Sequence, residues 1–77
     1  MTYRPPMFQV KSLSISHIGY ESSALYVRFA DGGLFRYDGV PFSLFTGLRL
    51  ARVMGHYLQI HILANYHGEH VPEEESI

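Results

Sequence analysis

Histidine and serine side chains are the first groups to consider for chemistry in this chain of 77 residues. Its five histidines would suit a metal ion, but their spacing does not favour one. His56 and His61 are five residues apart, about 140° around a helix, so they cannot share one ligand face. His67 and His70 lie in a polar tail without two further ligands nearby, whereas structural zinc takes four. We therefore expect no metal site and no cofactor.

Nucleophilic catalysis is equally unsupported by the sequence. Ser12, Ser14 and Ser16 alternate along a predicted strand, but neither a Gly-x-Ser-x-Gly turn nor local His–Asp support accompanies them. The chain contains no cysteine, which excludes thiol chemistry and disulfides. Asp31 and Asp38 form no evident acid–base couple. The sequence predicts a protein that is not an enzyme.

The distribution of charged residues along the chain is weak evidence for an anionic partner. Residues 1–68 carry all six lysine and arginine side chains against the carboxylates Glu21, Asp31 and Asp38, and the other four glutamates are in the tail. The body is therefore mildly basic, short of the bias of a strong nucleic-acid binder. Because the chain has no basic-then-apolar leader and no long apolar run, we expect a cytoplasmic protein without membrane contact.

The hydrophobic pattern predicts one α+β domain in the order βββαα, a three-stranded antiparallel meander followed by two helices packed on one face. Alternation predicts strands over residues 10–18 and 24–30 and a third from residue 34 to Val40-Pro41. Helical spacing predicts helices over 42–51 and 56–65. Residues 1–9 are expected to be a flexible lead-in, 10–66 the domain, and 67–77 a disordered acidic tail.

The DGG turn at residues 31–33 sets the register of the second hairpin. A three-residue turn pairs Phe29 with Phe35, Val27 with Tyr37 and Leu25 with Gly39, which keeps one face apolar. That register makes Arg28 and Arg36 direct cross-strand neighbours on the other face. Either the two side chains splay apart near Asp38 and Glu21, or they hold an anion such as phosphate. The predicted core is Leu13, Ile15, Leu25, Val27, Phe29, Phe35, Tyr37, Phe45, Leu48, Leu58 and Ile62.

These motifs, taken in order, resemble those of the KTSC domain family over residues 10–66. The matching residues are Val10 and Ser12, Ile18-Gly19-Tyr20, Phe29 with Gly32, Gly33, Phe35 and Tyr37, Val40-Pro41, Ala51, Gly55 with Tyr57, and Ile62 with Tyr66. The family is named after an appendage of some lysyl-tRNA synthetases and also occurs as free-standing bacterial proteins. The resemblance therefore implies RNA as a partner, without a mechanism.

Departures from the family pattern bear on that implication. Its central Tyr-x-Tyr is Phe35-Arg36-Tyr37 here, and its paired serines are Ser12-Leu13. Ile60, Leu63 and Asn65 stand at positions that are often basic in the family, which weakens the case for RNA on the second helix. Clustered surface apolar residues tend instead to mark interfaces.

Two hypotheses for function follow. The first is an RNA-binding module, for tRNA or single-stranded RNA, using Arg28, Arg36 and Lys11 on phosphates and Tyr26 for stacking. The second is a protein-interaction or self-association module, such as a homodimer, using Ile60 and Leu63 of the second helix. The acidic tail is expected to compete with RNA for the basic face.

Overall fold

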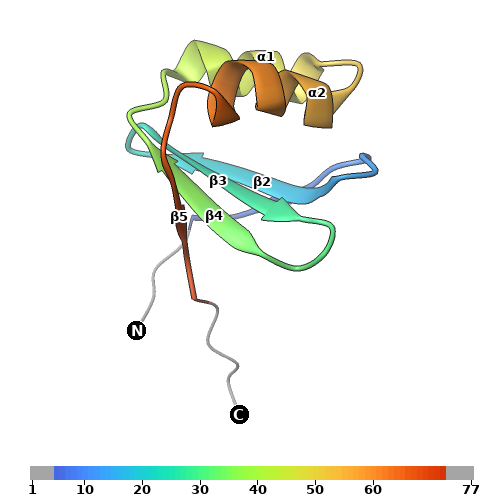
Figure 1. Ribbon diagram of the computed structural model, residues 1–77, viewed down its shortest axis with the longest axis horizontal. Coiled ribbons are helices and arrows are strands. Elements are labelled where there is room, and N and C mark those ends of the chain that lie inside the picture. Colours follow the sequence, from blue (N-terminus) through green and yellow to red (C-terminus); the bar gives the residue numbers. More distant parts are fainter. Residues whose placement is uncertain (1–4, 73–77) are drawn as a thin grey trace.

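The computed structural model describes residues 5–72, which form an antiparallel sheet covered on one face by helices (Figure 1). The strands follow chain order across the sheet: β1 (Phe8–Gln9), β2 (Ile15–Glu21), β3 (Ala24–Phe29), β4 (Leu34–Asp38) and β5 (Gly68–His70). The helices are α1 (Phe42–Leu50) and α2 (Met54–Leu58), and α2 continues into one π-helical segment, η1 (Gln59–Leu63). The predicted α+β class is confirmed, but the described sheet has five strands rather than three.

The two additional strands form the edges of the sheet, in segments expected to lie outside the domain. β1 pairs Phe8 with Ile18 of β2, and β5 pairs Glu69 with Arg36 of β4. Strands of two and three residues are too short for alternation to reveal them. The remaining expectations of flexibility and disorder, for residues 1–4 and 73–77, fall outside the described residues.

The predicted strand over 10–18 is wrong in its first half, where residues 10–14 form a loop. The Ser12 hydroxyl accepts hydrogen bonds from the backbone N–H groups of Ser14 (3.2 Å) and Ile15 (3.3 Å). A serine side chain that accepts hydrogen bonds from the backbone N–H groups two and three residues later favours a turn over a strand. Leu13 lies in this loop with its side chain 100% exposed, so its predicted place in the core is also wrong.

A β-bulge in β2 explains why Ile18 was not predicted as a core residue. Ile15 lies opposite Phe29 and His17 opposite Arg28, so the register shifts between Ile15 and His17. Strict alternation would put Ile15 and Ile18 on opposite faces, but the extra residue brings both into the main core. After the bulge β2 continues to Glu21, three residues beyond the predicted end of this strand at residue 18.

Ser22 and Ser23 form the two-residue turn between β2 and β3, with φ of 55° and 64°. Tight hairpin turns of this kind prefer Asn-Gly, because other side chains are strained at positive φ. We expect Ser23→Gly to raise the free energy of unfolding by about 1 kcal/mol, measured by urea denaturation. Ser23→Ala, which keeps the strain, should give no gain; equal effects of the two changes would contradict this explanation.

The hairpin between β3 and β4 has a different register from the one predicted. Val27 lies opposite Phe35 and Leu25 opposite Tyr37, and the connecting loop is Ala30 to Gly32, with φ of 106° at Gly32. Phe29 N–H donates to the carbonyl of Gly33 at 2.8 Å and closes that loop. The shift is two residues, so every side chain keeps its predicted face while its direct partner changes.

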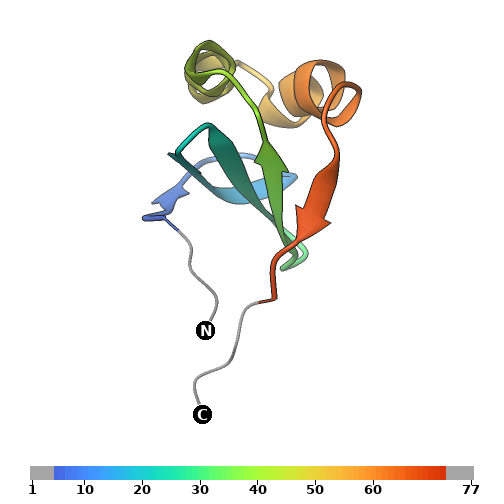
Figure 2. The ribbon, with the colours of Figure 1, turned by 90° about the vertical axis from the view of Figure 1, so that its left-hand side faces the viewer.

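The main core lies between the sheet and the helices, which lie side by side over one face (Figure 2). All the predicted core residues except Leu13 are buried in it or pack against it as partly buried neighbours, and Ile18, Val40 and Met54 join them. The stripe of Leu58 and Ile62 on the second helix faces the sheet as predicted, with 2% and 0% exposure.

The buried phenol of Tyr37 makes the free energy of unfolding depend on pH in the alkaline range. Its side chain is 4% exposed, and burial raises the pKa of its phenol above the usual value. The unfolded chain therefore releases this proton at a lower pH than the folded one. The stabilisation is complete below a pH of about 10 and is lost as pH rises from there towards the higher pKa of the folded state. Tyr37→Phe should flatten this part of the stability–pH curve; an unchanged slope would contradict the assignment.

Candidate functional site

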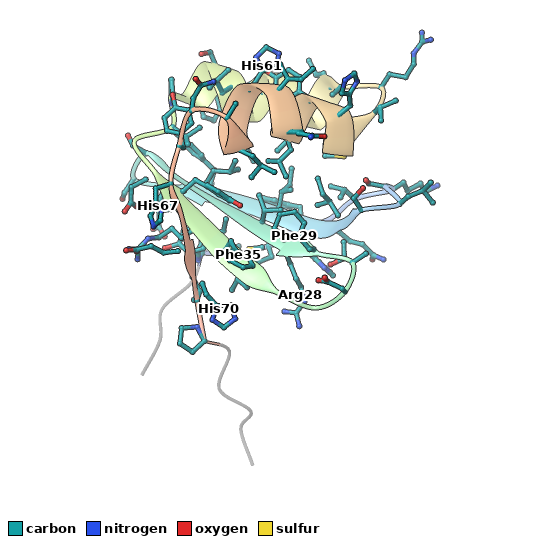
Figure 3. The ribbon with its side chains drawn as sticks, viewed as in Figure 1. Arg28, Phe29, Phe35, His61, His67 and His70 are labelled. Carbon is teal, nitrogen blue, oxygen red and sulfur yellow. The ribbon has the colours of Figure 1, made fainter. Side chains whose placement is uncertain are left out.

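The sheet face opposite the helices, here called the open face, carries Arg28, Arg36 and Tyr26, three of the residues predicted to bind RNA. Figure 3 shows Arg28 on this side of the sheet. Tyr26 is 7% exposed and packs in a small second core with Ala24, Leu34 and Val71, against which Met7 also packs. A buried ring cannot offer its face to a base, so Tyr26 lacks the exposure that a stacking platform needs.

Met7 and its neighbours cross this face at Gly19. A Cβ atom at Gly19 would lie 2.7 Å from the Met7 sulfur and 2.9 Å from the Pro6 carbonyl oxygen. Glycine is therefore required at this position for the segment before β1 to approach β2. The segment covers part of the face on which the RNA hypothesis relied.

Arg36 is neutralised by two carboxylates. Its Nη2 atom lies 2.7 Å from Glu69 Oε1, in a hydrogen-bonded ion pair, and its Nε atom lies 3.2 Å from Asp38 Oδ1, in a charge contact. Asp38, then a hydrogen bond with the side chain of Tyr26, and then Glu69 raise the pKa of the guanidinium. Glu69 belongs to the predicted acidic tail, so part of that tail does contact a basic residue of this face.

The predicted pairing of Arg28 with Arg36 is wrong. Arg28 lies opposite Leu34, and Arg36 lies opposite Tyr26 on one side and Glu69 on the other. The two arginines are diagonal neighbours because the register is shifted by two residues. Glu21, Asp38 and Glu69 lie on the same face, so among the described residues the two arginines of the open face are outnumbered by three carboxylates.

The histidines are dispersed over the fold. Among residues 5–72, no three His, Asp or Glu side chains come together as a group that could hold a metal ion. His61 lies on the outer side of the helices against Tyr57, with ring centroids 4.3 Å apart, and His70 lies against Phe35 at 5.4 Å (Figure 3). Each therefore has an aromatic partner.

The outer side of the helices, here called the helical surface, differs in composition from the open face. No Asp or Glu occurs from residue 39 to residue 68, while Arg52, His56 and His61 are exposed. Arg49 is also exposed, but it lies on the flank of α1, where it lines a pocket with Phe8 and Gln9 of β1. Ile60 and Leu63, the predicted interface residues, are 50% and 43% exposed, and two further apolar side chains, Leu50 and Val53, are 79% and 61% exposed. This surface combines positive charge with apolar area.

A cleft of about 520 Å³ opens at one end of the molecule, here called the end cleft. The 10–14 loop and the connection between α1 and α2 lie at the same end of the ribbon, on the right of Figure 1. No carboxylate lines the cleft among the described residues, whereas two cations do. The lining residues are Lys11, Ser12, Leu13, Ser14, Arg52, Val53, Met54, Gly55, His56 and Gln59.

Lys11 is thus brought together with Arg52, not with Arg28 and Arg36. Sequence reasoning grouped Lys11 with the sheet arginines because it predicted a strand at that position. Arg52 and His56 were not selected as site residues. The sequence feature that could have identified this site is the absence of aspartate and glutamate over 30 consecutive residues, from 39 to 68.

The fold and these surfaces define a small α+β domain, an antiparallel sheet backed by a helix pair. The chain belongs to the KTSC domain family, whose sequence pattern matches residues 11–66. Its fold is similar to that of a KTSC domain protein from Yersinia pestis in a crystal structure, with a TM-score of 0.82. The two are 23% identical, and the match covers 87% of this chain and 97% of that one.

No match was found among the curated proteins. Within residues 5–72, no helix has the length and hydrophobicity needed to cross a membrane.

Proposed function

We propose that this domain is a small, non-catalytic, cytoplasmic binding module for RNA, and that the helical surface rather than the open face contacts the phosphate backbone. The observation that carries the proposal is the absence of any carboxylate from residue 39 to residue 68, alongside exposed Arg52, His56 and His61. Phosphate contacts supply most of the sequence-independent affinity for nucleic acids, and they require cations that acidic neighbours do not neutralise.

Charge segregation supports this choice of surface. The open face carries Glu21, Asp38 and Glu69, and Arg36 is held between the last two. A phosphate approaching Arg36 would have to displace one of these carboxylates. Among the described residues, the helical surface carries no carboxylate that would have to be displaced, and its exposed apolar side chains add contact area beside the cations.

The salt dependence of RNA binding tests the proposal. For a short single-stranded RNA, the slope of log K against log salt should fall in magnitude by about 0.7 for each phosphate contact removed. We expect this change for Arg52→Ala, and no change for Arg36→Ala, since Arg36 is already neutralised. The reverse pattern would move the binding surface to the open face, and absence of binding at low salt would reject RNA as the partner.

A second candidate function is self-association through Ile60 and Leu63. The observation in its favour is the exposure of these two side chains together with Leu50 and Val53 on one layer of the fold. Exposed apolar patches of this kind often mark contacts between proteins.

Light scattering coupled to size-exclusion chromatography tests this second candidate. If the chain forms a dimer, Ile60→Asp should return it to the mass of a monomer, 8.8 kDa, while Arg36→Ala should leave the dimer unchanged. A monomer at high protein concentration would exclude self-association.

A further inference from the structure

We propose that the end cleft binds a single nucleotide unit, with the phosphate between Lys11 and Arg52 and the base against Leu13 and Val53. This inference rests on the proposed function for the source of the nucleotide, which is either free in solution or part of an RNA chain. The choice of a phosphate and a base as the bound groups rests only on the residues that line the cleft.

The charges in the cleft are available to a ligand. Lys11 and Arg52 form no ion pair with any described residue, and no carboxylate is found among the described lining residues. By contrast, Arg36 contacts two carboxylates and Arg49 lies over the Phe45 ring, 5.9 Å from its centroid. His56, Ser14 and Gln59 add hydrogen-bonding groups along the same walls. An acid-free concavity with two cations is suited to a phosphate group.

The walls of the cleft are held in place before any ligand arrives. The Ser12 hydroxyl fixes the turn of the 10–14 loop, and the Ser14 carbonyl accepts a hydrogen bond from Ala30 N–H at 2.8 Å. On the other side, Ser14 approaches the start of α2 so closely that a Cβ atom at Gly55 would lie 2.7 Å from its Oγ. The absence of a side chain at position 55 therefore allows the two walls to approach closely. A preformed site avoids the entropic cost of ordering a loop on binding.

The size and rim of the cleft indicate a ligand larger than phosphate. Its volume of about 520 Å³ is within the range of sites for small organic molecules, roughly 300–1,000 Å³. Leu13 and Val53, both lining residues, are 100% and 61% exposed. Apolar side chains beside two cations can cover the face of a base while the phosphate binds the charges. This combination distinguishes a nucleotide from a simple anion.

The test is an amide NMR titration of the labelled protein with AMP, inorganic phosphate and adenosine, each to about 10 mM, which detects millimolar affinities. We expect AMP to shift residues 11–14 and 52–59, phosphate to shift them more weakly, and adenosine not to shift them. Lys11→Ala and Arg52→Ala should each weaken AMP binding about ten-fold, the value of one charge-assisted hydrogen bond. Arg36→Ala, the matched control on the open face, should bind AMP like the unchanged protein, because Arg36 does not line the cleft and is paired with Asp38 and Glu69.

Gly55→Val gives an independent check, because its branched side chain would meet Ser14 Cβ as well as the hydroxyl group, and so should separate the walls and weaken AMP binding without changing any charge. Unchanged AMP binding by this variant would contradict the preformed cleft. A 5′-phosphorylated trinucleotide that binds more tightly than AMP would identify RNA as the source of the nucleotide, and the reverse order would identify free nucleotide.

Shifts outside the end cleft, equal binding of phosphate and AMP, or no binding at all would overturn the inference. If AMP does not bind the cleft but RNA binds with a salt dependence that Arg52→Ala reduces, the inference about the cleft fails and the proposed function is kept. If AMP binds the cleft and RNA does not bind, the proposed function fails and the site remains.

Discussion

Replacing Leu48 with alanine should lower the free energy of unfolding by about 3 kcal/mol. Leu48 is in the last turn of α1, with 0% exposure, and packs in the main core between helix and sheet. The change removes buried methyl groups and leaves a cavity that rigid neighbours fill only in part. A domain of this size has modest stability, so the loss would take a large share of it. Urea denaturation would measure this loss in the free energy of unfolding, provided that the variant and the unchanged protein have the same m-value.

Leu50→Ala is the matched control on the same helix. Its side chain is 79% exposed, so the same chemical change should alter the unfolding free energy by less than about 0.5 kcal/mol. Similar losses for the two variants would show that Leu50 is covered in solution, which would in turn favour self-association of the helical surface.

Gly68→Val should release β5 from the sheet. A Cβ atom at Gly68 would lie 2.5 Å from Cε2 and 2.9 Å from Cζ of Tyr37. Because the Tyr37 ring is 4% exposed, it has little room to move aside, and overpacking of this kind costs about 1–3 kcal/mol. Detachment of β5 would also remove the ion pair of Glu69 with Arg36.

Hydrogen exchange at Val71 gives the local readout for this variant. The Val71 N–H donates to the Leu34 carbonyl at 2.8 Å, just beyond β5, and should exchange faster once the strand is released. His67→Val, the same residue type placed at the neighbouring exposed position, should leave that exchange rate unchanged. If Gly68→Val left Val71 protected, the close contact with Tyr37 would not be what requires glycine at position 68.

Patterns within one element were predictable from the sequence, and contacts between elements were not. The stripe of Leu58 and Ile62 identifies the buried side of the second helix because helical periodicity alone decides it. The face of each residue in β3 and β4 was also correct, since a register error of two residues preserves alternation. The bulge at Ser16 and the turn in which the Ser12 hydroxyl accepts two backbone hydrogen bonds are local irregularities, which no periodicity reveals.

The same difference between patterns within one element and contacts between elements applies to the candidate site. The exposure of Ile60 and Leu63 followed from their positions on the helix, and the structure confirms it. The surroundings of Arg36 could not be predicted, because Glu69 is 33 residues away in the sequence and reaches Arg36 through an edge strand of three residues. The position of Lys11 and Arg52 in one cleft likewise depends on two loops that lie far apart in the sequence.

The shortness of the edge strands governs how copies of this domain can meet at high concentration. β1 has two residues and β5 has three, so each edge offers little unpaired backbone to a strand from another molecule. Leu50, Val53, Ile60 and Leu63 lie instead on the helical layer, whose backbone groups are largely engaged within the helices. Contact between copies would therefore proceed through side chains and remain reversible on dilution, without growth of a continuous intermolecular sheet.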